Sequence, residues 1–117
     1  MQERIDIIDK ISEDVNGLMR RVINNEIITE KDKEEQASKL RVHKRGDLVT
    51  LELLPQTLNS NISIREMALR GLIAVDDNKN ESVKNKAVAR MLLIKEDGEE
   101  GSFIRELASK YLENNQK

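Results

Sequence analysis

The segment "SIREMALRGLIAV" at residues 63–75 decides the fold of this 117-residue chain. Ser63 and Glu66 form a capping-box pair that marks the start of a helix. The apolar residues that follow recur at helical spacing, and they are Ile64, Met67, Ala68, Leu72, Ile73 and Val75. A helix that is apolar on most of its surface is normally buried. We therefore expect this segment to be the most buried element of the protein.

Two further helices are predicted after this segment, which makes residues 63–114 a three-helix carboxyl-terminal core. The loop "DDNKNE" (76–81) precedes a helix over about residues 82–96, and Gly98 suits the left-handed position that ends it. Ser102 can cap the last helix, and the tail "ENNQK" (113–117) should fray. The apolar stripe of this last helix consists of Phe103, Ile104, Leu107, Ala108, Tyr111 and Leu112.

The two stretches "IREMALRGL" (64–72) and "IRELASKYL" (104–112) are similar at an offset of 40 residues. The offset matches helical-hairpin repeats, but a stable repeat array needs about three units. The repetition is therefore either a duplication or a coincidence between two amphipathic helices.

Residues 3–25 predict an amphipathic helix whose apolar stripe can pair with a second copy of the chain. Gly17 inside it costs about 1 kcal/mol relative to alanine, so the helix needs packing to persist. Packing on its own domain fits the pattern as well as a homodimer does. The candidate dimer or partner interface consists of Ile8, Ile11, Val15, Leu18, Met19 and Val22.

The next segment is polar, and Thr29 followed by acidic residues offers a helix start. It predicts a solvated helix or a connector up to residue 39. A third hypothesis is that the protein is a structural or assembly factor in which this polar segment folds only when it binds a partner. Residues 40–54, "LRVHKRGDLVTLELL", alternate apolar and polar around Gly46-Asp47, which favours a short β-hairpin. The rival interpretation is a helix that begins at Asp47 and ends before Pro55.

The composition supports a mainly α-helical fold. Proline occurs once, aromatic residues make up 2% and charged residues 36%, so the core must be aliphatic. The length fits one domain, residues 1–117. We expect a small helical domain of about four to five helices with a short β-hairpin at residues 40–54.

The segment "SIREMA" resembles the first helix of helix-turn-helix regulators, which implies that the helix at 82–96 serves as a recognition helix. Gly71 comes one position early for that pattern, and the connector "VDDNKNE" is several residues too long. The candidate nucleic-acid contacts combine a basic hairpin tip with this helix. They are Lys39, Arg41, His43, Lys44 and Arg45, with Lys84, Lys86 and Arg90.

The residue types present argue against most catalytic chemistry. The chain has no cysteine, which excludes thiolate metal sites. It has a single histidine, His43, which disfavours a self-contained serine triad. Acidic runs lack the spacing of a calcium loop, and no phosphate-binding glycine loop occurs. We expect no enzyme activity, no cofactor and no metal.

Location and partners follow from the same features. No apolar run reaches the length of a membrane span, the amino terminus lacks the pattern of a signal peptide, and cysteine is absent. We therefore expect a cytoplasmic protein without a membrane role. The leading hypothesis is a small regulatory or adaptor protein that binds a larger protein, as a homodimer. The alternative is a nucleic-acid-binding regulator, although the net charge of −2 disfavours a globally basic binder.

Overall fold

The computed structural model describes residues 2–75 and 79–115, and this part of the chain is mainly helical, with no strand. Its helices are joined by short turns, two of which are 3-10 helices. In chain order the elements are α1 (Gln2–Ile23), α2 (Glu30–Lys39), the 3-10 turn η1 (Leu40–His43), α3 (Gly46–Leu53), the 3-10 turn η2 (Leu54–Leu58), α4 (Ile62–Ala74), α5 (Glu81–Glu96) and α6 (Ser102–Asn115). The expectation of a mainly α-helical protein is confirmed.

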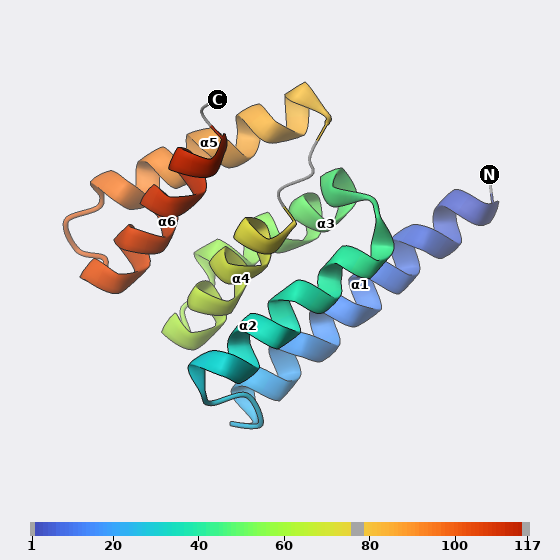
Figure 1. Ribbon diagram of the computed structural model, residues 1–117, viewed down its shortest axis with the longest axis horizontal. Helices are drawn as coiled ribbons and strands as arrows, with labels where there is room; N and C mark the ends of the chain where they lie inside the picture. Colours follow the sequence, from blue (N-terminus) through green and yellow to red (C-terminus); the bar gives the residue numbers. More distant parts are fainter. Residues whose placement is uncertain (1, 76–78, 116–117) are drawn as a thin grey trace.

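Helix α4 lies at the centre of the arrangement. Figure 1 shows α1 and α2 running antiparallel on one side of α4, and the α5–α6 pair on its other side. Helix α4 contacts α1, α2, α3 and α6, and most of its residues are buried. The segment at 63–75 is thus the buried centre that its apolar composition predicts. The buried side chains of α1 to α6 form one continuous cluster.

The predicted β-hairpin at 40–54 is wrong, because this segment forms η1 and α3. A hairpin would place Val49, Leu51 and Leu53 on one face. In the helix Val49 and Leu53 are fully buried, four residues apart, whereas Leu51 is 41% exposed. The left-handed residue of this segment is Lys44, with φ 56°, and not Gly46. Alternation over five residues is also compatible with a helical i, i+4 pair, and core packing selected the helix.

The caps of three helices differ from the prediction. Asn61 caps α4, since its side-chain Oδ1 accepts the N–H groups of Ser63 at 2.8 Å and Ile64 at 3.4 Å. Ser63 therefore lies inside the helix and is not its cap. Ser102 is the first residue of α6 and not its cap. No described glycine adopts a positive φ, so Gly98 does not have the left-handed conformation expected of it.

The start of α2 agrees with the prediction, whereas the end of α6 does not. Thr29 caps α2, with its Oγ1 accepting the Asp32 N–H at 3.1 Å, so the polar segment forms the helix that was one of its two predicted structures. Residues 113–115 continue α6, where the tail was expected to fray. The predicted loop at 76–81 and the tail at 113–117 fall partly outside the described residues.

The repeat positions occupy equivalent places in α4 and α6. Ile64 and Ile104, Ala68 and Ala108, and Leu72 and Leu112 are all buried. The two helices contact each other and run in the same direction (Figure 1). A shared core-facing stripe accounts for the identical apolar residues.

Candidate functional site

The turn after α1 shapes the first candidate site. Asn25 adopts a left-handed conformation with φ 60°, which asparagine tolerates better than most residues. The Asn25 N–H donates to the Val22 carbonyl at 3.1 Å, and the Glu26 N–H donates to the Arg21 carbonyl at 2.9 Å. This pair of bonds is the Schellman arrangement that ends helices. It turns the chain sharply toward α2.

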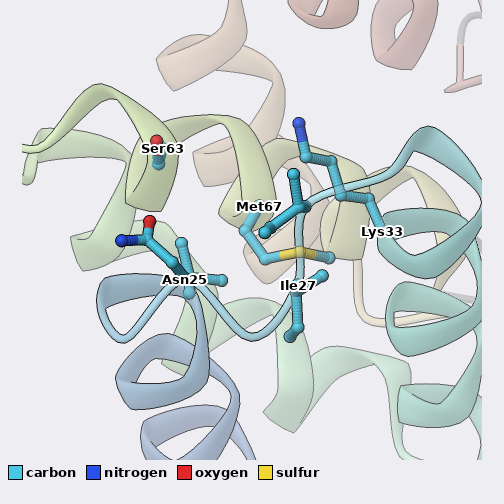
Figure 2. A pocket seen from close by; sticks show the side chains of 7 residues that line it. Asn25, Ile27, Lys33, Ser63 and Met67 are labelled. Atoms are coloured by element: carbon cyan, nitrogen blue, oxygen red, sulfur yellow. The ribbon is translucent and has the colours of Figure 1, made fainter.

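A pocket of about 140 Å³ lies between this turn, α2 and the start of α4. Figure 2 shows Asn25, Ile27, Lys33, Ser63 and Met67 around it. The full lining consists of Val22, Asn25, Ile27, Ile28, Lys33, Ser63 and Met67. Four apolar side chains thus line the pocket together with one amide, one hydroxyl and one ammonium group. We call this the turn pocket.

Three exposed isoleucines either line the turn pocket or adjoin one of its lining residues in sequence. Ile28 lines it and is 67% exposed. Ile23 and Ile62 are also exposed, and each is the neighbour in sequence of a lining residue. Exposed apolar residues clustered beside a pocket mark an interaction surface more often than scattered ones do.

Next to this pocket, Arg70 forms the largest ion-pair cluster of the described residues. The Arg70 side chain is only 4% exposed. Its guanidinium donates from Nε to Glu66 at 2.8 Å, from Nη1 to Glu34 at 2.7 Å and from Nη2 to both carboxylate oxygens of Glu30, at 3.0 and 2.9 Å. It also lies over the Phe103 ring, 5.5 Å from the centroid. The cluster therefore joins α2, α4 and α6.

The electrostatics of Arg70 fit a structural role. Burial lowers the pKa of its guanidinium, but the hydrogen bonds that it donates to Glu66 and Glu30, together with the negative charges of these carboxylates, outweigh burial and raise that pKa above its usual value. Lys33 adds a second cation, with its Nζ 3.1 Å from Glu66. None of the sequence-based predictions includes this cluster. The i, i+4 spacing of Glu66 and Arg70 was the one available signal, because the two α2 carboxylates lie far away in sequence.

A second ion pair joins the first turn of α4 to the loop before α6. Arg65 donates two hydrogen bonds of 2.9 Å to Glu100 and a third, also of 2.9 Å, to the Asn59 carbonyl. The Arg65 hydrogen bond is the main reason why the pKa of Glu100 lies below its usual value. In the repeat, Arg105 takes the place of Arg65, yet its Nε is buried without a partner among the described residues. The two repeat copies therefore differ in their polar contacts.

An open groove of about 710 Å³ lies between α1 and the α2–η1 segment. On α1 the acidic residues Glu13 and Asp14 precede Gly17 and the basic residues Arg20 and Arg21 follow it, and Lys39 lines the groove from α2. Val42 lines it and is 72% exposed. The full lining consists of Glu13, Asp14, Gly17, Leu18, Arg20, Arg21, Gln36, Ser38, Lys39, Leu40 and Val42.

The residues of the candidate dimer interface lie mostly in the core of the same chain. Ile11, Val15, Leu18, Met19 and Val22 are buried, and they pack in one cluster with α3, α4 and the rest of the core. Ile8 alone among the six is exposed. The stripe of α1 is thus used within the chain, and a dimer that buried it would have to open the core.

Four of the eight candidate nucleic-acid contacts are engaged inside the chain. Arg41 Nε donates to the Ala74 carbonyl at 2.6 Å, and His43 Nε2 lies 2.8 Å from the Asp14 carboxylate. Arg45 pairs with Asp47 at 3.2 Å, and Arg90 Nε donates to Thr57 Oγ1 at 3.0 Å.

The other four contacts are lysines, on two separate elements. Lys39 and Lys44 are exposed on the α2–η1–α3 segment, and Lys86 is exposed on α5, where Lys84 is half-buried. None of the four forms an ion pair with a carboxylate of the described residues. The expected hairpin tip does not exist, so the basic residues around His43 diverge toward α1, α3 and α4.

Among residues 2–75 and 79–115, no group of three or more acidic or histidine side chains is arranged to hold a metal ion. The helices of the same part of the chain are too short or too polar for one of them to cross a membrane. Comparison of the chain with family models, curated proteins and solved structures gives no match.

Proposed function

We propose that this protein is a small non-enzymatic adaptor of the cytoplasm that binds a larger protein by accepting one apolar side chain of it in the turn pocket. The size of the turn pocket carries the proposal. Small-molecule sites usually occupy about 300–1,000 Å³, whereas the turn pocket holds about 140 Å³. A volume of roughly 150 Å³ is enough for one benzene-sized group, so the turn pocket has room for a single leucine, methionine or phenylalanine side chain against Ile27 and Met67, with the polar groups of Asn25, Lys33 and Ser63 beside it.

The rim of the turn pocket defines the chemistry of the partner segment. Asn25 and Lys33 carry hydrogen-bond donors beside the apolar floor of Ile27 and Met67 (Figure 2). Protein interfaces combine a buried apolar anchor with a polar rim in this way. The partner therefore presents one apolar anchor flanked by carbonyl or carboxylate oxygens, and exposed Ile28 adds apolar contact area next to it.

Blocking the mouth of the pocket tests the proposal. Ser63 is exposed at the pocket, and its backbone N–H already bonds to Asn61, so Ser63→Phe fills the entrance without removing a cap. Ser102→Phe is the matched control, because Ser102 is exposed at the start of α6 and does not line the turn pocket. Peptides are first selected from a random library on the wild-type protein, and their affinities for the three proteins are then measured by calorimetry.

We expect selected peptides to share one essential apolar residue and to bind the Ser102→Phe variant like wild type. The Ser63→Phe variant should bind them at least about tenfold more weakly, since an anchor typically contributes 2 kcal/mol or more. Equal affinity for Ser63→Phe and wild type would remove the turn pocket from the interface.

Nucleic-acid binding is the second candidate, and the exposed lysines Lys39, Lys44 and Lys86 favour it. It predicts binding to labelled DNA or RNA that weakens steeply with salt. Reversal of charge at Lys84 and Lys86 should then lower the affinity and flatten the salt dependence, as measured by fluorescence anisotropy. Absence of binding at low salt would exclude this candidate.

A further inference from the structure

Gly17 occupies a helical position where the chain itself gives no reason for glycine. A Cβ atom added at Gly17 would meet only the Arg20 guanidinium, at 3.9 Å. At Gly71, by contrast, a Cβ would lie 2.9 Å from Leu53 Cδ1 and 3.1 Å from Leu40 Cδ1, so packing within the chain requires that glycine. Glycine inside a helix costs about 1 kcal/mol relative to alanine. At Gly17 this cost is not explained by any contact within the described chain.

The charges on both sides of Gly17 are arranged so that the same surface complements itself. Glu13 and Asp14 stand four and three residues before Gly17, and Arg21 and Arg20 stand four and three residues after it. All five residues line the open groove between α1 and α2. Because the opposite charges are six to eight residues apart, they lie beyond the i, i+4 reach and cannot pair with each other along α1.

We propose that two copies of this protein form a symmetric dimer in which the α1 helices pack antiparallel and cross at Gly17. A two-fold axis makes each contact occur twice, with residue i of one copy facing residue j of the other. With Gly17 on the axis, Glu13 faces Arg21 of the second copy and Asp14 faces its Arg20. A parallel pairing would instead bring like charges together, so the charge order selects the antiparallel one.

The groove provides the surface on which the second α1 helix lies. The absence of a side chain at Gly17 lets two helix backbones approach closely at the crossing point. Val42, which is 72% exposed in the groove, gains an apolar neighbour there. Two of the charged residues have partners within the chain, Asp14 with His43 at 2.8 Å and Arg21 with Gln36 at 3.0 Å. These contacts orient the two side chains along the wall of the groove.

This dimer is distinct from the proposed partner binding, because it uses another face of α1. Val22, which lines the turn pocket, lies about 140° from Gly17 around the helix at ~100° per residue. It also differs from a dimer through the apolar stripe of α1, since that stripe stays in the core of each copy.

Charge reversal at one designed pair tests the dimer. The variants are Glu13→Arg, Arg21→Glu and the double variant that carries both changes. Glu35→Arg is the matched control, because Glu35 is exposed on α2 and does not line the groove. The oligomeric state is measured by sedimentation velocity from micromolar to millimolar concentration at low salt, and circular dichroism verifies that each variant is folded.

We expect wild type and Glu35→Arg to dimerise, and each single reversal to weaken the dimer roughly tenfold or more, because it places two like-charged pairs at the interface. The double variant should dimerise again, and an equal mixture of the two single variants should form heterodimers. Added salt should weaken the wild-type dimer. A wild-type monomer at millimolar concentration, or a dimer that survives both single reversals, would overturn the proposal. Peptide binding to the turn pocket is unaffected by either result.

Discussion

At the scale of single residues, two arginines connect elements that the apolar core alone does not fix. Arg70 gathers three carboxylates from α2 and α4, and Arg65 holds Glu100 against the loop before α6. Both use the planar guanidinium to make several hydrogen bonds at once, which a lysine ammonium cannot reproduce in the same geometry. Burial then strengthens each contact and raises the cost of losing it.

Replacement of Arg70 should be destabilising. Arg70→Met keeps much of the side-chain volume but leaves Glu66 with Lys33 as its remaining cation. Glu30 and Glu34 are mostly exposed, so water solvates their carboxylates when Arg70 is lost. We expect Arg70→Met to lower the free energy of unfolding by about 1–2 kcal/mol in urea denaturation, as the hydrogen bond to Glu66 and the contact with Phe103 are lost. Arg70→Lys should lose less, and Glu34→Gln under about 1 kcal/mol, since Glu34 is exposed. Wild-type stability of Arg70→Met would contradict this role.

The Arg65–Glu100 pair should make stability depend on pH in the acid range. The pKa of Glu100 is lower in the folded chain than the usual value of a glutamate carboxyl, mainly because of its hydrogen bonds with Arg65. A group with a depressed folded pKa stabilises the fold above its unfolded pKa, and this stabilisation is lost as the pH falls through the folded value. We expect Glu100→Gln to be about 1–2 kcal/mol less stable than wild type at neutral pH.

The difference should shrink below about pH 4 as Glu100 of the wild type becomes protonated. Urea titrations of both proteins across this range measure it. A difference that stays constant with pH would show that the carboxylate charge of Glu100 does not stabilise the fold.

At the scale of elements, the two helical glycines have opposite environments. Gly17 in α1 faces an open groove, whereas Gly71 in α4 lies against Leu53 and Leu40. The same residue type therefore relieves crowding within the chain at Gly71, whereas at Gly17 it lowers the stability of the single chain and leaves the groove side of α1 open. Helix α3 shows a related contrast, because its apolar residues at 49, 51 and 53 have different exposures that alternation could not predict.

Alanine at the two glycines should change stability in opposite directions. Gly17→Ala should stabilise the monomer by up to about 1 kcal/mol, because alanine is the better helix former and no atom but the flexible Arg20 side chain is near. Gly71→Ala should destabilise by about 1 kcal/mol, since overpacking of 1–3 kcal/mol exceeds the gain in helix propensity. Thermal unfolding at low protein concentration measures both. Stabilisation by Gly71→Ala would mean that Leu53 and Leu40 move aside without cost.

At the scale of the whole molecule, α4 is the element that the others share. Helices α1 and α2 lie on one side of it and the α5–α6 pair on the other (Figure 1). The single cluster of buried side chains runs through α4, so the two sides are coupled by packing. The surfaces proposed for binding, the turn pocket and the α1 groove, both lie on the α1–α2 side.

The slowest amide exchange should therefore occur in α4. Its backbone opens only when contacts to both sides break, so its exchange should report global unfolding. Exposed helices such as α2 should exchange through smaller local openings. Native-state hydrogen exchange read residue by residue measures this order. Slowest exchange confined to α1 or to the α5–α6 pair would show that the two sides unfold independently.

The sequence by itself determined the helical class, the apolar stripes and the burial of the segment at 63–75. These features depend on residues within a few turns of one another, so periodicity and composition are sufficient to predict them. The predicted stripes of α1, α4 and α6 contain most of the apolar residues that the structure buries there, but Ile8 and Phe103 are exposed, and Leu69 is fully buried outside the predicted stripe.

Only the tertiary structure decided what each stripe contacts and where the charged residues point. The stripe of α1 fits a dimer or the core of its own chain equally well, and the presence of α3 and α4 beside it made the difference. The Arg70 cluster and the turn pocket each combine segments that are far apart in sequence. Such contacts depend on how the helices pack, because a helical pattern fixes which face is apolar but not which surface covers it.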